Sequence, residues 1–312
     1  MTEKPRINPY LLLLIGILSV STAAILIRLA QREAGSVSIA AWRLVFASGL
    51  AWFAVLLGKK EIKLPQKRGS LALLGLAGLA LAVHFASWIS SLEYSSITTS
   101  TVLVNTQPLW VAMLSPLMLR ERVPKAFYLG LFIAFLGGTI LAMGGSCAFQ
   151  SGRISCDFGG VLAGKDPRLG IALAILGALM GAVYFLIGRK VGAGMDTFVY
   201  TAIVYSLSAF ALLAFALALR QPLWGFSIST WALLLGMAVI PQTLGHSVLN
   251  HALKFLPAML VSLALLAEPV GTSLLAVALL KEIPAPSEVI GGVLILFGVI
   301  YAVWPRKRAN GA

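Results

Sequence analysis

Charged side chains are scarce in this sequence, and their scarcity decides its class. Only 11% of the 312 residues are charged, against roughly 25% in an ordinary globular domain. Hydrophobic residues make up 59% of the chain. This balance excludes a soluble globular protein and predicts an all-α integral membrane protein. For such a protein the chain length is no guide to a number of soluble domains.

The chain also lacks the local signatures of common enzymes and metal sites. It has no His-x-x-x-His zinc spacing, no P-loop and no Gly-x-Ser-x-Gly elbow. We therefore expect no catalytic residue, no metal and no cofactor. No short apolar region with a small-residue cleavage site precedes the first apolar stretch, so Tyr10–Ala30 is expected to be retained as a helix.

Long apolar runs are what the chain has in abundance. A helix that crosses the hydrocarbon core needs about 20 mostly apolar residues, and short polar segments separate ten runs of about that length. The ten predicted transmembrane helices are Pro9–Ala30, Val37–Leu57, Leu71–Ser91, Ile97–Leu119, Ala126–Gly144, Leu169–Arg189, Thr197–Leu219, Ile228–Leu249, Pro257–Leu280 and Val289–Trp304.

The net charge of +13 is explained by membrane topology. With a cytoplasmic N-terminus and ten crossings, sixteen of the 24 lysines and arginines fall inside and seven outside. This positive-inside bias removes the need for a nucleic-acid partner. It predicts a multi-pass protein of the cell (inner or plasma) membrane with both termini cytoplasmic. We expect a monomer or a homodimer.

Two prolines inside apolar runs mark an internal duplication. Pro108 follows Gln107, Pro269 follows Glu268, and the prolines lie 161 residues apart (269 − 108). The same shift relates six further pairs: Gly16 and Gly177, Arg28 and Arg189, Gly75 and Gly236, Glu121 and Glu282, Gly130 and Gly291, Gly137 and Gly298. Because independent helices would not agree in register and loop length, the chain is one five-helix unit present twice.

An odd number of crossings per unit means that the second copy enters the membrane from the opposite side. The sequence thus predicts two inverted five-helix repeats around a central cavity, an architecture of many secondary transporters. The divisions are residues 1–144 for the first repeat, 145–167 for an extracytoplasmic loop, 168–305 for the second repeat and 306–312 for a cytoplasmic tail. We expect Pro108 and Pro269 to break their helices near the midplane.

The loop at 145–167 holds both cysteines of the chain, Cys147 and Cys156. The predicted topology places this loop outside, where an oxidising environment permits a disulfide. Two unpaired thiols are the alternative, because the sequence does not define the geometry of the pair.

Polar residues form helical stripes in only some of the segments, which we predict to line the cavity. Segment three has His84, Ser87, Trp88 and Ser91 on one face. Segment four offers Asn105 before Gln107, segment six carries Tyr184 among glycines, segment eight carries His246, and segment nine carries Glu268. Segments five and ten carry glycines at helical spacing and are predicted to pack as a scaffold.

Glu268 is the strongest single signal, because a carboxylate at mid-bilayer is costly and marks an ion path, a proton relay or a paired charge. One interpretation is a group that takes a coupling proton or a substrate ammonium. The other is a structural carboxylate that pairs with Arg43, the other embedded charge, or satisfies backbone groups freed by Pro269. Arg43 is assigned a structural role by default.

His84 and His246 are single histidines on different helices, which favours substrate or helix contacts over a metal site. We place His84 toward the outer half of the membrane and His246 toward the inner half. His84 is a second candidate for protonation. Trp88 beside it suits stacking on a cation or an aromatic ligand, with an interfacial anchor as the alternative.

With these residues in view, the chain resembles the drug/metabolite transporter superfamily, in its ten-helix EamA-like branch. The resemblance rests on Ile27–Ala30, Ala41–Leu44, Thr98–Glu121 and Gly130–Gly138, repeated in part as Leu256–Glu282 and Gly291–Gly298. It implies two inverted five-helix bundles around a cavity, with the fifth and tenth helices peripheral. The family often has Trp-Gly in its first helix, where this chain has Ser19-Val20-Ser21-Thr22.

Family members commonly export amino acids or related metabolites, and eukaryotic relatives exchange nucleotide or phosphorylated sugars. The leading hypothesis is a secondary active exporter of a small metabolite such as an amino acid, not an enzyme, that works by alternating access, with protons as the candidate coupling ion. The predicted substrate-binding residues are His84, Trp88, Asn105, Gln107, Tyr184, His246 and Glu268. The alternatives are a nucleotide-sugar or drug-type substrate, a membrane-embedded enzyme acting on lipid, and a non-transporting scaffold.

Overall fold

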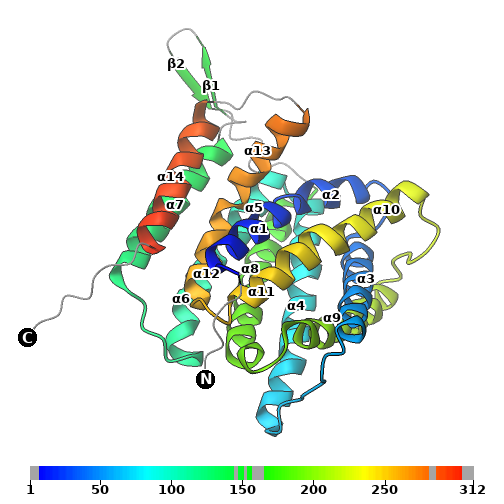
Figure 1. Cartoon of the computed structure of the whole chain (residues 1–312). Helices are drawn as coiled ribbons and strands as arrows, with labels where there is room; N and C mark the ends of the chain where they lie inside the picture. The colour runs from blue at the N-terminus through cyan, green and yellow to red at the C-terminus, as the bar shows by residue number, and fades with distance from the viewer. Residues whose placement is uncertain (1–6, 144–146, 151–152, 157–164, 281–285, 304–312) are drawn as a thin grey trace, which may run out of the picture.

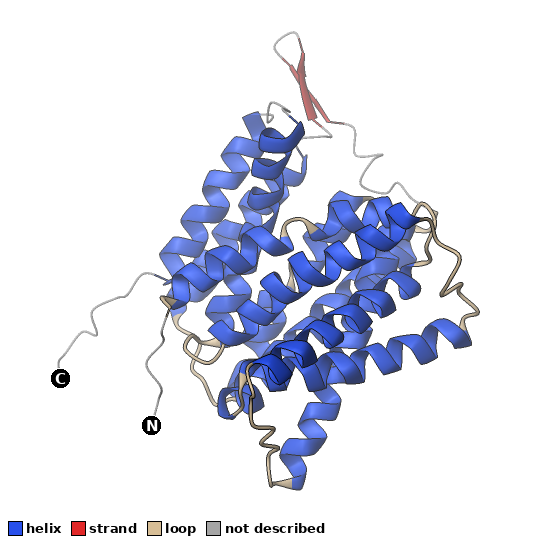
Figure 2. Ribbon diagram, turned by 45° about the vertical axis from the view of Figure 1, so that its right-hand side comes forward, coloured by secondary structure: helices blue, strands red, loops and turns tan. Residues whose placement is uncertain are grey.

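The computed structural model describes residues 7–143, 147–150, 153–156, 165–280 and 286–303. Within these ranges the chain is a bundle of helices with one small hairpin (Figures 1 and 2). Seven helices are long and apolar enough to cross a membrane, and two shorter apolar helices cover Lys125–Leu141 and Val289–Ala302. Large apolar side chains point outward, among them Leu117 and Phe210, which are 79% and 76% exposed, as expected of a surface that faces lipid.

The first half of the chain contains seven helices. They are α1 (Pro9–Val20), α2 (Ala23–Ala30), α3 (Ser36–Leu57), α4 (Arg68–Tyr94), α5 (Ile97–Val104), α6 (Gln107–Met118) and α7 (Lys125–Met143). The expected first segment is thus two helices, α1 and α2, separated at Ser21–Thr22. The expected fourth segment is also divided into two helices, α5 and α6.

The described part of the second half contains seven further helices and three irregular helical segments. They are α8 (Pro167–Val191), η2 (Gly192–Gly194), α9 (Thr197–Ala218), α10 (Ile228–Met237), η3 (Ala238–Ser247), α11 (Val248–Ala252), α12 (Ala258–Ala264), η4 (Leu265–Ala267), α13 (Glu268–Leu280) and α14 (Pro286–Val303). The η3 segment is a π-helix, with Pro241 inside it.

The helix boundaries repeat with the shift found in the sequence. The starts of α3, α5, α6 and α7 at residues 36, 97, 107 and 125 become the starts of α9, α12, α13 and α14 at 197, 258, 268 and 286, each 161 later. In α6 and α13 the proline is the second residue of the helix. Its missing N–H lies in the first turn, where no intrahelical bond is lost, so each proline begins a new helix after the break.

Side-chain contacts repeat with the same shift. Arg28 Nη1 donates to the carbonyl of Leu92 at 2.8 Å, and Arg189 Nη1 donates to the carbonyl of Leu253 at 2.7 Å. Arg189 also reaches Glu121, with Nε 3.3 Å from Oε1. Glu282, the counterpart of Glu121, lies outside the described residues.

Helices α7 and α14 form a pair at the edge of the bundle (Figure 1). A Cβ atom at Gly130 would lie 2.5 Å from the carbonyl oxygen of Gly298, and one at Gly137 would lie 2.6 Å from that of Gly291. The pairing is reciprocal and antiparallel, because Gly298 and Gly291 approach the same partners from the other side. Only glycine permits this approach, which matches the predicted packing role of these segments.

The loop between the halves differs from an all-helical expectation. β1 (Cys147–Gln150) and β2 (Arg153–Cys156) pair as an antiparallel hairpin in which Cys147 stands opposite Cys156. The side chains of both cysteines lie outside the described part, so their disulfide stays a prediction.

Candidate functional site

A small cavity of about 40 Å³ lies in the middle of the helix bundle. Its lining comes from both halves of the chain: Val20, Ala23, His84, Trp88, Val104, Asn105, Gln107, His246, Leu265 and Glu268. Six of the seven predicted substrate-binding residues are among them. Tyr184 is the exception.

His84 is oriented by a glycine-lined face of α8. Its Nδ1 lies 2.8 Å from the carbonyl oxygen of Gly177, and its ring stacks on Trp88 with 6.0 Å between centroids. At Gly181 a Cβ atom would lie 2.7 Å from Gln107 Oε1 and 2.9 Å from His84 Nδ1. The glycine therefore lets both polar side chains lie against α8.

Two interrupted chain segments place the amide and carboxyl groups at the cavity. Gln107 begins α6 directly after the break at Asn105–Thr106, and Glu268 begins α13 after the η4 turn. The break between α1 and α2 lies against the start of α13. The Ser21 hydroxyl donates to the carbonyl of Glu268 at 3.0 Å, and the Thr272 hydroxyl donates to the carbonyl of Ser21 at 2.9 Å. Hydroxyl groups thus replace backbone bonds lost at the breaks.

Arg43 lies behind the cavity rather than on its wall. Its side chain is fully buried, and its Nε donates to Gln242 Oε1 at 2.8 Å. Its guanidinium carbon stands 4.2 Å from the ring centroid of Phe85. The pairing with Glu268 considered from the sequence is absent from the ion pairs of the described residues.

Tyr184 was expected in the cavity and is buried one layer outside it. Its hydroxyl accepts a hydrogen bond from the Asn250 amide, and Asn250 also donates to the carbonyl of His246 at 2.8 Å. Tyr184 therefore supports the backbone of a cavity residue. One turn along α8, a Cβ atom at Gly188 would lie 3.1 Å from Asn250 Oδ1, so this glycine lets α11 approach α8.

The expected separation of His84 and His246 to opposite halves of the membrane is wrong. Their ring centroids are 6.3 Å apart, and both line the cavity that Glu268 also reaches. The 161-residue shift carries position 84 to 245, so the two histidines occupy neighbouring positions of the two copies. No group of three or more metal-ligating side chains occurs among the described residues.

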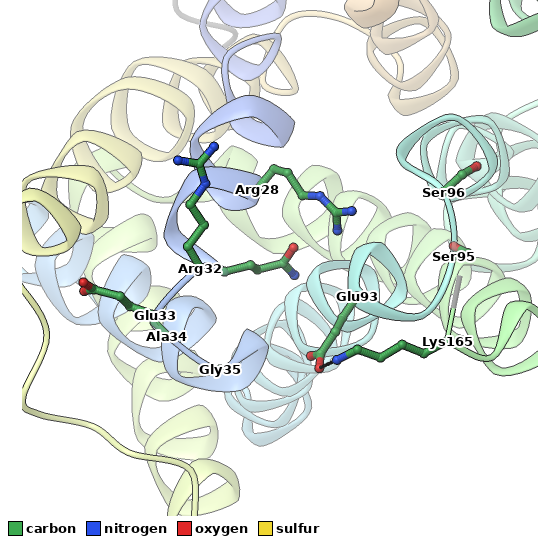
Figure 3. Close-up of a pocket in the computed structure, with 10 residues that line it drawn as sticks. Arg28, Arg32, Glu33, Ala34, Gly35, Glu93, Ser95, Ser96 and Lys165 are labelled. Atoms are coloured by element: carbon green, nitrogen blue, oxygen red, sulfur yellow. Dashed lines mark hydrogen bonds and ion pairs between the residues drawn. The ribbon is translucent and has the colours of Figure 1, made fainter. Parts of the chain in front are cut away.

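A second hollow, of about 850 Å³, opens at one end of the bundle. Figure 3 shows Arg28 and Arg32 on one side of it, and Glu93 with Lys165 on another. Lys165 Nζ is 3.0 Å from Glu93 Oε1. The exposed Glu33 turns away toward the loop before α10, where hydrogen bonds from the Thr230 hydroxyl and from Ser227 lower its pKa below the usual value of 4.5.

The comparison with known families decides what kind of molecule has this cavity. The sequence profile described as the EamA-like transporter family matches residues 7–143 and again 168–304. The chain belongs to the EamA-like transporter family. The two matches start 161 residues apart (168 − 7), so the family unit is the duplicated unit read from the sequence. A family of membrane transporters fits both the apolar helices and the polar centre of the bundle.

Curated relatives of this family member are named as transporters. An uncharacterized transporter of Archaeoglobus fulgidus is 27% identical over 93% of this chain and 95% of its own length. The uncharacterized transporter YyaM of Bacillus subtilis is 27% identical over 85% and 83%. The pseudopaline exporter CntI of Pseudomonas aeruginosa is 22% identical over 86% and 88%.

A solved crystal structure shares the fold of this EamA-like chain. It superposes with a TM-score of 0.75 at 19% identity and covers 96% of this chain and 98% of that one. At this identity the likeness shows the fold alone.

Sequence reasoning missed three features of the site. It did not find Gln242 or Phe85 as the neighbours of Arg43, and it gave no sign of the π-helix that presents Gln242. Pro241 inside a long apolar run was the available signal, since proline removes a backbone donor and favours irregular helix. The third missed feature, the break at Ser21–Thr22, also had a signal in the sequence, because serine and threonine compete with the helix backbone for hydrogen bonds.

Proposed function

We propose that this protein is a secondary active transporter that exports a small metabolite, such as an amino acid, by alternating access. The observation that carries the proposal is the convergence of six polar or aromatic side chains from both repeats on one buried cavity. The family and the names of its relatives support a transporter. Outward transport follows the exporter among those relatives.

In this proposal the chain crosses the membrane ten times as two inverted repeats, with both termini cytoplasmic. The reciprocal contacts of Gly130 with Gly298 and of Gly137 with Gly291 support the inversion. A two-fold axis in the membrane plane relates antiparallel helices in this way. The matching bonds of Arg28 and Arg189 to backbone carbonyls fit the same axis.

The cavity is too small for a metabolite in the conformation described. It measures about 40 Å³, whereas ligand sites of roughly 300–1,000 Å³ are usual. Binding must therefore separate the helices that line it. The breaks before α6 and α13 supply the places where the wall can move, since no continuous helix has to bend there.

Glu268 provides the coupling in this proposal, because its carboxylate can hold a proton or a substrate ammonium group but not both. A proton that enters and replaces the substrate ammonium group on Glu268 would then drive export of the substrate. Of the residues lining the cavity, Glu268 alone carries a carboxyl group. His84, which lies at the same cavity, is the second protonatable group.

The deciding experiment is counterflow in proteoliposomes with a panel of amino acids, with and without a proton gradient. We expect saturable exchange of at least one amino acid. Its rate should rise when a gradient drives protons in the direction opposite to the movement of the amino acid. Nucleotide sugars and cationic drugs complete the panel. A folded protein that exchanges no compound would refute the proposal.

One finding favours a second candidate, a membrane-embedded enzyme acting on lipid. Such an enzyme needs acid–base groups within reach of one another, and His84, His246 and Glu268 share one cavity. Incubating the purified protein with defined phospholipids and analysing the products separates the two. Lipid turnover that His84→Ala abolishes would establish the enzyme, and solute exchange without turnover would reject it.

A further inference from the structure

Arg43 has hydrogen-bonding capacity that its surroundings do not use. The side chain is 0% exposed and only its Nε has a hydrogen-bond partner, while Nη1 and Nη2 have none among the described residues. A buried guanidinium that lacks partners is costly. The Phe85 ring 4.2 Å away offsets part of the cost through its π-electrons, but it accepts no conventional hydrogen bond from the two nitrogens.

Unused donors continue from Arg43 to the cavity. Gln242 Nε2 beside Arg43, and Trp88 Nε1 and Gln107 Nε2 on the cavity lining, are buried without partners among the described residues. All of these atoms donate and none accepts. Among the unpartnered buried atoms of the described residues, Gln31 Oε1 and Asn250 Oδ1 can only accept, and neither residue lines this cavity. His246 Nδ1, on the lining, is also unpartnered and donates or accepts according to its tautomer.

A single layer of rings separates Arg43 from the cavity. Phe85, under the guanidinium, lies 5.3 Å from the ring of His246 and 4.8 Å from that of His84, measured between centroids. Both histidines line the cavity. Widening the cavity on this side to metabolite size must displace this layer, which consists of His84 and Phe85 from α4 and His246 from the π-helix η3.

The unsatisfied donors define the chemistry of the missing acceptor. Several nitrogen donors, two of them on the guanidinium of Arg43, match a carboxylate, which accepts at two oxygens and pairs with arginine in a two-bond geometry. A neutral carbonyl would satisfy one donor and leave the charge of Arg43 uncompensated. Glu268, also on the cavity lining, supplies the opposite charge for an ammonium group.

We propose that Arg43, Trp88 and Gln107 recognise the carboxylate of the transported molecule, and that the site is selective for zwitterions whose ammonium group faces Glu268. The proposal rests on the transporter function above. Arg43 is then a specificity-determining residue and not only a structural one. Amines and carboxamides of the same size are poor substrates because they leave the donors unpaired.

The test compares the twenty proteinogenic amino acids with their α-carboxamides in counterflow. Wild type is expected to prefer the acid over the amide by about tenfold or more, the usual effect of one lost charge-assisted contact. Arg43→Gln should bring that ratio close to one, and Arg43→Lys should keep part of it. Trp88→Phe, which removes the donor and keeps a ring, should reduce the ratio less.

Arg68→Gln is the matched control, because it removes a guanidinium from the exposed start of α4 and should leave the ratio unchanged. Gel filtration and tryptophan fluorescence establish that each variant is folded. If Arg43→Gln does not fold, the ratio in Arg43→Lys and Trp88→Phe decides.

Two different failures remain distinguishable. The role of Arg43 is overturned if wild type exchanges amides as fast as acids, or if folded Arg43→Gln keeps the wild-type ratio of acid to amide exchange. The proposed transporter function is unaffected by either result. Exchange of no compound by folded wild type overturns the proposed function and this inference with it.

Discussion

Gln107 and Glu268 occupy the same position in the two copies and differ only in an amide and a carboxyl group. Each is the first residue of a helix that starts after a break, and each lines the cavity. Because the two side chains have nearly the same shape, the two helix starts can pack alike, while of this pair only Glu268 can exchange a proton. The pair therefore makes the two copies chemically unequal at one matched position.

At this scale we predict the effect of Glu268→Gln, which gives the two copies the same side chain at the first residue of α6 and of α13. Exchange of the substrate should lose its dependence on pH and on a proton gradient, and apparent KM should rise by about tenfold, the loss of one charged contact. Uptake into proteoliposomes over a range of pH measures both. Glu61→Gln, in the exposed loop after α3, should change neither, and folded Glu268→Gln with a normal pH profile would contradict the prediction.

Among the elements, α7 and α14 differ from the helices around the cavity. They touch through glycines whose Cα atoms face the opposite backbone, and they carry no cavity residue. Several of the segments that line the cavity are interrupted or distorted, as α5–α6 and η3–α11 show, whereas α4 is continuous. Rigid packing and broken helices are thus divided between different parts of the repeat.

The element-scale prediction compares two neighbouring glycines on α7. A Cβ atom at Gly137 would lie 2.6 Å from Gly291 O, whereas at Gly138 nothing comes within 4 Å. Gly137→Ala should therefore destabilise the protein by about 1–3 kcal/mol through overpacking. Gly138→Ala should be neutral or slightly stabilising, since alanine favours helix. Thermal unfolding in detergent measures the difference, and equal midpoints would show that the α7–α14 contact contributes little.

The whole molecule has two ends that differ in this conformation. At one end Arg189 joins Glu121 and the carbonyls of Leu253 and Lys254. At the other end Arg28 keeps the matching bond to Leu92 and borders the hollow of about 850 Å³. Alternating access, in our proposal, exchanges these two arrangements across the repeat axis.

The prediction at this scale concerns orientation in the membrane. Lys67 and Ile228 are related by the repeat (228 − 67 = 161). Lys67 directly precedes α4, Ile228 is the first residue of α10, and both are exposed. In a background with Cys147 and Cys156 changed to serine, Ile228→Cys should react with a membrane-impermeant maleimide on intact cells. Lys67→Cys should react only after permeabilisation, and labelling of both from the same side would exclude inverted repeats.

Much of the fold could be read from the chain because lipid constrains it strongly. A backbone in hydrocarbon must satisfy its own hydrogen bonds, so apolar runs of the right length predict helices. The breaks before Gln107 and Glu268 were predicted from the prolines and are present. The break at Ser21–Thr22 and the π-helix were not predicted, because each depends on a neighbour that supplies the missing bonds, as Thr272 does for Ser21.

The sequence by itself determined the membrane class, the duplicated unit with its 161-residue shift and most of the cavity lining, because each depends on composition or period. Only the tertiary structure decided which polar groups meet. It brought His84 to His246, paired Arg43 with Gln242 and placed Tyr184 outside the cavity. These outcomes follow from the depth and rotation of helices far apart in sequence, which are set by the packing of two copies against each other and by no local pattern.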